Sequence, residues 1–314
     1  AAMITSPAWK DKKYAVLGLA RSGRATVEPL LAAGADVLVW DDRVEAREPF
    51  AGRCAIGDPL QADLTGFAGV VVSPGVPLNT HPIKPYADGY GVPVIGDIEL
   101  FAQARPELPP HKVVGITGTN GKSTTTALVH HILKAVGVPT TMGGNIGLPI
   151  LEQEPLPEGG VYVLELSSYQ IDLTFSLACD VAILLNITPD HLDRYDGLYA
   201  YAASKSRLFA MQRRGQHSIA RFTDARSLGQ FAEGSIASIL EDVFQHRGIA
   251  PDEQNGWKSL AGSHNRENAA AAIEACDILG IPIDQIREGL RTYPGLPHRM
   301  ERVAEIGGVA YVND

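Results

Sequence analysis

A short run of residues has the types and the spacing needed to bind nucleotide phosphates. Positions 115–124 read Gly-Ile-Thr-Gly-Thr-Asn-Gly-Lys-Ser-Thr, between an expected strand at 113–117 and an expected helix at 123–136. Glycines let backbone N–H groups approach phosphate oxygens, and the start of a helix adds partial positive charge. We expect Lys122 to contact the β- and γ-phosphates of ATP, and the Ser123 hydroxyl to bind Mg²⁺. The general pattern G-x-x-x-x-G-K-[ST] is not met strictly, because Ile116 stands where its first glycine would fall.

Three further side chains could take part in metal or phosphate chemistry. Glu165 ends an expected buried strand, and a carboxylate at a strand end can hold Mg²⁺ opposite the phosphate loop. His191 closely follows the next expected strand, where it could bind a metal or donate a hydrogen bond. Lys205 lies on an expected helix, and taken alone it reads as a solvated lysine.

Alternating strand and helix patterns predict how these residues are positioned. Because buried strands alternate with helices, we expect an α/β fold with a mainly parallel sheet and right-handed crossovers. The expected strands are 13–17, 37–40, 70–72, 92–95, 113–117, 162–166 and 181–187, and the expected helices are 24–33, 123–136, 198–212 and 265–279. A proline-rich joint at 105–112 separates two blocks. The predicted organisation is a Rossmann-like domain at 1–107, an ATPase-type domain at 108–300, and the start of a third domain at 301–314, with two short strands around Gly307-Gly308.

Composition excludes several classes of protein. The chain has 314 residues, a net charge of −9 and a pI of about 5.5, which argues against binding to nucleic acid. It contains three isolated cysteines, Cys54, Cys179 and Cys276, as expected for a reducing compartment. No apolar run is long enough for a membrane helix and no signal-peptide pattern opens the chain, so we expect a cytoplasmic protein. Ala1 and Ala2, ahead of Met3, resemble an expression scar.

The first block carries a second glycine motif of lower specificity. Positions 18–23 read Gly-Leu-Ala-Arg-Ser-Gly after the first expected strand, and Asp41 and Asp42 follow the second. A dinucleotide fingerprint would have glycine at the position of Ala20. The motif is therefore weak evidence for a nicotinamide cofactor and fits better a domain that holds the UDP end of a sugar nucleotide.

Several segments together resemble the Mur ligase and folylpolyglutamate synthetase superfamily. The string T-G-T-N-G-K-S-T at 117–124 is similar to the ATP loop of that superfamily. The segments P-D-H-L-D-R-Y at 189–195 and G-L-P-H-R at 295–299 resemble the glutamate-adding members of the Mur ligase family. The resemblance covers nearly the whole chain, from Gly18 to Asp314.

The resemblance implies roles for individual residues. It implies ATP binding by Gly118, Thr119, Asn120, Gly121, Lys122, Ser123, Thr124, Asn268, Arg299 and Asp314, with Asn268 nearest the base and Asn265 either beside it or capping its helix. It implies UDP-sugar binding by Leu19, Ala20, Arg21, Ser22, Asp41, Asp42, Arg43, Ser73, Pro74, Gly75, Asn145 and His191. Two Mg²⁺ ions would be bound by Ser123, Glu165, His191 and Lys205, the last as a carbamate. Catalysis would depend on Lys122, Glu165, His191, Lys205 and Arg299.

The implied reaction is ATP-dependent amide formation. ATP would phosphorylate the alanine carboxylate of UDP-N-acetylmuramoyl-L-alanine, and the amine of D-glutamate would displace phosphate from that acyl phosphate, in peptidoglycan precursor synthesis. The partners are these three small molecules, and a monomer is expected. A third domain, which binds the amino acid in the family, would follow Asp314. This chain is therefore expected to bind the UDP-sugar but to ligate poorly or not at all, and its binding of ATP stays open.

Three alternative readings remain open. The chain could be another Mur ligase or a folylpolyglutamate synthetase, which would share the ATP site. It could be a nicotinamide-dependent dehydrogenase, although that reading leaves the phosphate loop unexplained. It could also be a nucleotide-binding module without activity in this fragment.

Overall fold

The computed structural model contains two separate parallel sheets and a small strand pair. It describes residues 2–221, 236–240, 243–297, 301–306 and 309–313, the last two ranges by their backbone alone. The α/β fold class expected from the sequence is confirmed. The strands are β1 (Lys13–Leu17), β2 (Asp36–Trp40), β3 (Ala55–Ile56), β4 (Phe67–Val72), β5 (Val94–Ile95), β6 (His111–Thr117), β7 (Thr140–Gly144), β8 (Gly160–Glu165), β9 (Val181–Leu184), β10 (His217–Ala220), β11 (Ile236–Ile239), β12 (Glu301–Ile306) and β13 (Val309–Asn313).

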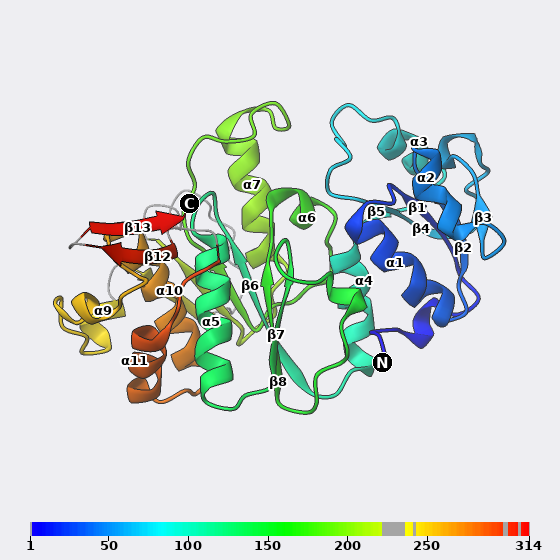
Figure 1. The fold of residues 1–314 in the computed structure, drawn as a ribbon. Helices are drawn as coiled ribbons and strands as arrows, with labels where there is room; N and C mark the ends of the chain where they lie inside the picture. Colours follow the sequence, from blue (N-terminus) through cyan, green and yellow to red (C-terminus); the bar gives the residue numbers. More distant parts are fainter. Residues whose placement is uncertain (1, 222–235, 241–242, 298–300, 307–308, 314) are drawn as a thin grey trace.

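Helices connect the strands and cover both sheets (Figure 1). The α-helices are α1 (Arg21–Ala32), α2 (Val44–Arg47), α3 (Ile83–Gly89), α4 (Asp97–Ala104), α5 (Lys122–Ala135), α6 (Ser168–Asp172), α7 (Gly197–Ala210), α9 (Val243–His246), α10 (Ser263–Ile278) and α11 (Ile283–Thr292). Single turns of 3₁₀-helix occur at Pro7–Trp9, Glu48–Phe50, Pro59–Gln61, Arg105–Glu107, Ile150–Glu152 and Glu253–Gly256. None of the helices in the described ranges combines the length and hydrophobicity needed to cross a lipid bilayer.

The strand order places a switch point in each sheet. The first sheet has the order β3-β2-β1-β4-β5 and the second the order β11-β10-β9-β6-β8-β7, with every pairing parallel. The chain therefore reverses its direction of winding beside β1 in the first sheet and beside β6 in the second. Ligands of such sheets bind at the carboxyl ends of the strands at this point. The segments that follow β1 and β6 are the two glycine motifs.

The two sheets share part of their hydrophobic interior. One cluster of buried side chains includes Val16 of β1, Phe101 of α4 and Leu164 of β8. The ring of Phe101 lies 5.1 Å from that of Tyr162, edge to face, and Figure 1 shows α4 between the two sheets. Strands β8 and β9 are buried along their whole length, as expected for parallel strands covered on both faces. The half of the molecule built around the first sheet and the half built around the second are thus packed together by apolar contacts.

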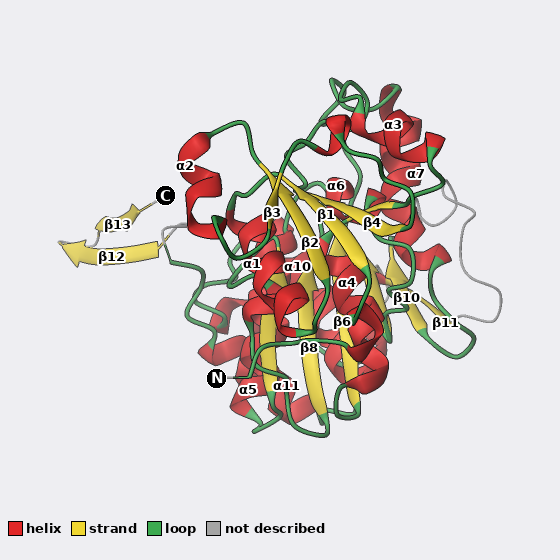
Figure 2. Ribbon diagram, turned by 90° about the vertical axis from the view of Figure 1, so that its right-hand side faces the viewer, coloured by secondary structure: helices red, strands yellow, loops and turns green. Residues whose placement is uncertain are grey.

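The last two strands form a hairpin of their own. Strands β12 and β13 pair antiparallel and extend neither sheet, and Figure 2 shows them outside the body of the fold. The two short strands predicted at 301–314 are confirmed. Other predicted ranges were wrong in their bounds by two or more residues. The strand expected at 181–187 ends at Leu184, that at 70–72 begins at Phe67, that at 92–95 begins only at Val94, and α1 begins at Arg21 rather than at residue 24.

Candidate functional site

The phosphate loop joins β6 to α5 and has the shape that its glycines predict. Gly121 is the residue before the helix and has a φ of +83°, a left-handed conformation that favours glycine. A Cβ atom placed there would lie 2.2 Å from Oδ1 of Asn268, so a larger residue would displace the Asn268 side chain and strain the left-handed backbone. Lys122 folds back over the loop, and its Nζ donates to the carbonyl oxygens of Gly118 at 2.8 Å and Thr119 at 2.9 Å. The structure brings Gly118 to Thr124 together at the head of α5.

Lys205 reaches the same loop from α7. Its side chain is buried, and Nζ donates to the carbonyl oxygen of Gly118 at 3.0 Å. Nζ also lies 4.7 Å from the ring centre of Tyr201. Burial, assisted by the nearby charge of Lys122, lowers the pKa of Lys205 to about 7. The prediction that Lys205, taken alone, is a solvated lysine is therefore wrong, and a large part of its amine is neutral near pH 7.

Glu165 ends β8 beside the phosphate loop and is held by the segment that follows β7. Its side chain is 3% exposed, and Oε1 accepts a hydrogen bond from Nδ2 of Asn145 at 3.4 Å. Gly144 has a φ of +83°, and a Cβ atom there would lie 2.1 Å from the carbonyl oxygen of Glu165. Oε2 of Glu165 is buried, and within the described residues it has no hydrogen-bond partner. A buried carboxylate oxygen without a partner suits a cation.

These residues do not form a ready-made metal centre. In the part of the chain that the structure describes, no three His, Cys, Asp or Glu side chains gather closely enough to hold a metal ion. The half-buried Ser123 is the second residue of α5. Glu165 and Ser123 therefore supply a carboxylate and a hydroxyl, and further ligands would have to come from His191, from Lys205 once it is modified, from phosphate groups or from water.

His191 has an unusual backbone. Its φ is +51°, which is uncommon for a residue other than glycine. The backbone N–H of His191 donates to Oδ1 of Asp190 at 2.8 Å, and its ring contacts the rings of Tyr169 and Tyr201 at centroid distances of 5.1 and 6.0 Å. The hydroxyl of Tyr201 lies 3.2 Å from that of Thr119. Tyr201 thus connects His191, Lys205 and the phosphate loop.

Two of the residues predicted near the adenine base, Asn268 and Asn265, lie among the described residues. Asn268 lies against the phosphate loop at Gly121, as described above, and its Nδ2 donates to Oδ1 of Asn265 at 3.3 Å. The suggestion that Asn265 caps its helix is wrong, because Gly262 is the capping residue and α10 already begins at Ser263. Arg299 and Asp314 lie outside the described residues.

A pocket lies at the carboxyl ends of the strands of the first sheet. It has a volume of about 350 Å³ and is lined by Leu17, Gly18, Trp40, Asp41, Asp42, Asp58, Leu60, Gly75, Val76, Pro77 and His81. Oδ2 of Asp41 accepts from the backbone N–H of Leu19 at 2.8 Å, and Oδ1 accepts from the N–H of Arg43 at 3.0 Å. Burial acts to raise the pKa of Asp41, but these hydrogen bonds outweigh it and lower the pKa. Asp41 stays ionised and fixes the two loops that border the pocket.

Other predicted sugar-nucleotide residues have mixed surroundings. The side chain of Leu19 is buried in the core, so it offers a ligand only its backbone. Arg21 donates through Nη2 to the carbonyl oxygen of Gly147, which joins the first glycine motif to the loop that carries Asn145. Oγ of Ser73 donates to the carbonyl oxygen of Gly18 at 3.1 Å. Ala20 and Asp42 are exposed, and Ser22 and Pro74 are half-buried.

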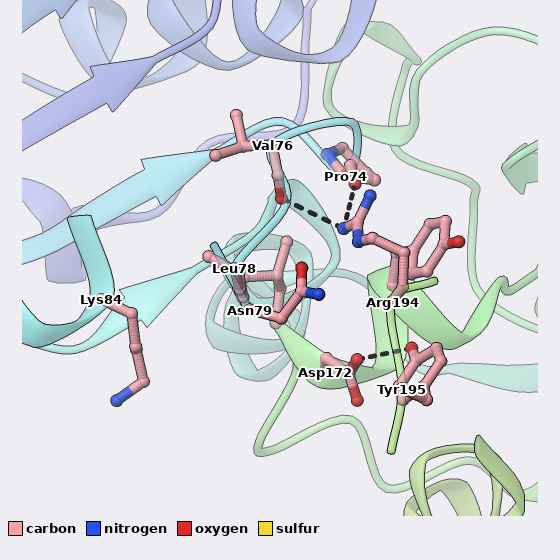
Figure 3. A pocket seen from close by; sticks show the side chains of 10 residues that line it. Pro74, Val76, Leu78, Asn79, Lys84, Asp172, Arg194 and Tyr195 are labelled. Carbon is pink, nitrogen blue, oxygen red and sulfur yellow. Dashed lines mark hydrogen bonds between the residues drawn. The ribbon is translucent and has the colours of Figure 1, made fainter. Parts of the chain in front are cut away.

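Another pocket, of about 270 Å³, lies where the two halves meet (Figure 3). Arg194 crosses this junction: Nη2 donates to the carbonyl oxygens of Val76 at 3.1 Å and Pro74 at 3.4 Å, and the guanidinium lies 4.0 Å from the ring centre of Tyr169. Nδ2 of Asn79 donates across the same junction to the carbonyl oxygen of Asp193 at 3.1 Å. The loop that carries His191 is thereby tied to the segment after β4.

Sequence reasoning missed several of these positioning residues. Arg194 stands inside the P-D-H-L-D-R-Y segment, yet a bond to a carbonyl oxygen in the other half leaves no trace in the sequence. The hydroxyl of Tyr195 donates to Asp172 at 2.6 Å, and Oγ of Ser204 donates to the other carboxylate oxygen at 2.6 Å. These residues hold the 190–195 loop against α6 and α7.

Comparison with known proteins reveals strong similarity to one group. Residues 116–241 match the model of the Mur ligase middle domain. The chain is 65% identical to the UDP-N-acetylmuramoylalanine–D-glutamate ligase of Novosphingobium aromaticivorans, over 99% of this chain and 70% of that protein. It is 60% identical to the ligase of the same name from Sphingopyxis alaskensis, over 99% of this chain and 71% of that protein. A crystal structure of the UDP-N-acetylmuramate:L-alanyl-γ-D-glutamyl-meso-diaminopimelate ligase of Neisseria meningitides has a similar fold, with a TM-score of 0.59 and 17% identity, covering 90% of this chain and 98% of that one.

Proposed function

The chain belongs to the Mur ligase family, and on that premise we propose that it provides the ATP and sugar-nucleotide sites of a UDP-N-acetylmuramoylalanine–D-glutamate ligase. The reaction joins D-glutamate to UDP-N-acetylmuramoyl-L-alanine at the expense of ATP, in peptidoglycan precursor synthesis. One observation carries this proposal furthest. The phosphate loop, the buried Lys205 and the carboxylate oxygen of Glu165 that has no hydrogen-bond partner among the described residues meet at the switch point of the second sheet.

The chemistry requires activation of a carboxylate. A free carboxylate is a poor electrophile, so its oxygen first takes the γ-phosphoryl group of ATP, and ADP leaves. The amine of glutamate then attacks the acyl carbon, and phosphate departs with the former carboxylate oxygen as the amide forms. The first step brings anionic groups together, so catalysis depends on positive charge placed where negative charge accumulates.

Residues of this chain supply that charge. Lys122 lies at the head of α5, where its ammonium would exchange the carbonyl oxygens of Gly118 and Thr119 for phosphate oxygens. Mg²⁺, held by Glu165 and Ser123 with His191 and Lys205 as further ligands, would neutralise phosphate charge during the transfer. Arg299 completes the proposed set.

Lys205 would act as a carbamate. An amine must be neutral to attack CO₂, and the lowered pKa of Lys205 leaves much of it neutral near pH 7. The product is an anionic group whose oxygens suit a hard cation. Labelling with ¹³C-bicarbonate tests this: the unsubstituted chain is expected to give a carbamate ¹³C resonance that Lys205→Ala lacks. The same resonance in both proteins would contradict the assignment.

The sugar nucleotide would bind along the first sheet and reach the second. The pocket beside Asp41 and Asp42 would take the uridine, and Ser73, Pro74 and Gly75 would face the diphosphate. Asn145 and His191 would flank the muramoyl-alanine arm, whose carboxylate must approach the phosphate loop. The hydrogen bond between Arg21 and Gly147 joins the first glycine motif to the loop that carries Asn145. The hydrogen bond between Asn145 and Glu165 joins that loop to the end of β8, beside the phosphate loop.

Calorimetric titration tests the proposal on the chain itself. We expect saturable binding of UDP-N-acetylmuramoyl-L-alanine and of Mg-ADP, each at one site, and no binding of NADH. Lys122→Met should weaken Mg-ADP binding and leave the sugar nucleotide's Kd unchanged. A preference for NADH over the sugar nucleotide, or no affinity for Mg-ADP, would refute the proposal.

A further inference from the structure

The side chain of Asn186 is bonded three times to the backbone of the phosphate loop. Asn186 follows β9, the neighbour of β6 on the side away from Glu165. Its Oδ1 accepts from the backbone N–H of Asn120 at 2.8 Å and from that of Thr119 at 3.1 Å, and its Nδ2 donates to the carbonyl oxygen of Asn120 at 3.0 Å. One amide side chain thus satisfies both polar groups of Asn120 and one of Thr119.

The backbone contacts around Asn186 extend the sheet into the loop. The N–H of Leu185 donates to the carbonyl oxygen of Thr117 at 3.0 Å, and the N–H of Thr119 also donates to the carbonyl oxygen of Asn186 at 3.0 Å. Beyond Asn186, Oγ1 of Thr119 donates to the carbonyl oxygen of Thr188 at 3.2 Å and accepts from its N–H at 3.0 Å. The loop is therefore fastened along one side by the chain segment 185–188.

We propose that Asn186 is a positioning residue that holds the phosphate loop in its binding conformation through residues 119 and 120. Its three bonds occupy the loop's polar groups ahead of Gly121. Phosphate oxygens would then approach the N–H groups at the start of α5. A loop ordered beforehand loses less conformational entropy when the nucleotide binds. Asn186 touches no phosphate in this account and acts only through the loop.

The role rests on the proposed function, and binding of Mg-ADP tests it. Asn186→Leu keeps a similar volume and removes all three bonds, and Asn186→Ala removes them with less bulk. Each is expected to raise the Kd for Mg-ADP about tenfold, because each lost hydrogen bond and the freed loop reduce affinity. The Kd for UDP-N-acetylmuramoyl-L-alanine should stay unchanged, since a merely destabilised fold would weaken both ligands. Asn255→Ala, at an exposed position in the turn Glu253–Gly256, is the matched control.

Each outcome decides one question. Weaker Mg-ADP binding with intact sugar-nucleotide binding supports the positioning role. If the unsubstituted chain binds Mg-ADP and both Asn186 variants bind it equally well, the inference is overturned while the proposed function stands. A parallel loss of both ligands would also overturn it, because Asn186 would then serve the fold in general. If the unsubstituted chain fails to bind Mg-ADP, the proposed function itself is refuted, and the role of Asn186 with it.

Discussion

Removing the Arg194 side chain should weaken sugar-nucleotide binding without removing any predicted ligand contact. Arg194 lies in the loop that carries His191, and its bonds end on the carbonyl oxygens of Pro74 and Val76 in the other half (Figure 3). Both connected segments are proposed to touch the same ligand. Arg194→Ala leaves them to be ordered by the ligand itself, which costs binding free energy.

The magnitude follows from the contacts. A hydrogen bond from a charged donor contributes about 1.5–3 kcal/mol, and the 3.1 Å bond to Val76 is the only short one of the two. Stacking on Tyr169 at 4.0 Å adds about 0.5–1 kcal/mol. Partial exposure reduces both, so we expect a loss of about 2 kcal/mol, which corresponds to a Kd raised about 30-fold. Arg194→Lys should recover little, because lysine lacks the planar fork.

Calorimetry with UDP-N-acetylmuramoyl-L-alanine measures this loss, and a neighbouring lysine provides the control. Lys84 lines the same pocket, but its Nζ pairs at 2.6 Å with Asp88 on its own helix and does not cross the junction. Lys84→Ala should leave Kd unchanged. Asn79→Ala breaks the other bond across the junction. The double variant should therefore lose less binding free energy than the two single variants lose together. An unchanged Kd for a natively folded Arg194→Ala protein, or an equal loss in Lys84→Ala, would refute this reasoning.

Three further substitutions test other parts of the site. Gly121→Ala should weaken Mg-ADP binding about tenfold in calorimetry, because alanine is strained in the left-handed conformation and its Cβ would displace Asn268; near-normal affinity would contradict the described loop. Glu165→Gln should leave sugar-nucleotide binding intact while abolishing the Mg²⁺-dependent gain in ADP affinity, and a persisting gain would place the metal elsewhere. Lys205, with its pKa lowered to about 7, should make the free energy of unfolding rise from pH 7 towards pH 10 in carbonate-free buffer, by up to about 1.4 kcal/mol per pH unit, because the unfolded chain binds more protons there. Urea unfolding of Lys205→Met should lack this rise, and an identical pH dependence in both proteins would disprove it.

Most of the longer buried strands were predictable from the sequence, whereas several strands of two to five residues were not. The strand at 13–17 was predicted at its exact bounds, and the helix after the phosphate loop within one residue at each end. Strands β3, β7, β10 and β11 were missed. Of these, β3 has two residues, and β7, Thr-Thr-Met-Gly-Gly, contains glycines that weaken any strand signal. Such strands form because a neighbour already presents its hydrogen-bonding edge, and this context is absent from a local pattern.

The candidate site shows the same division. The phosphate loop and Glu165 follow from residue types at strand ends, because parallel strands bring their carboxyl ends to one edge. The burial of Lys205 could not be read from its helix, since only the packing of α7 on the loop reveals it. Asn186 and Arg194 act through backbone atoms of distant segments. Backbone atoms have the same chemistry in every residue, so sequence carries no record of such partners.

The apolar cluster that continues from β1 through α4 to β8 has a consequence for how this protein can be rebuilt. Phe101 and its neighbours pack in the cores of both sheets, so separating the halves would expose apolar side chains on each of them. A hybrid made by exchanging the segment up to the end of α4 between two relatives would therefore succeed only where the exchanged α4 fits the side chains of both parents. Substitutions in this shared cluster on one side must be matched by compatible side chains on the other, even where the ligands of the two sheets differ.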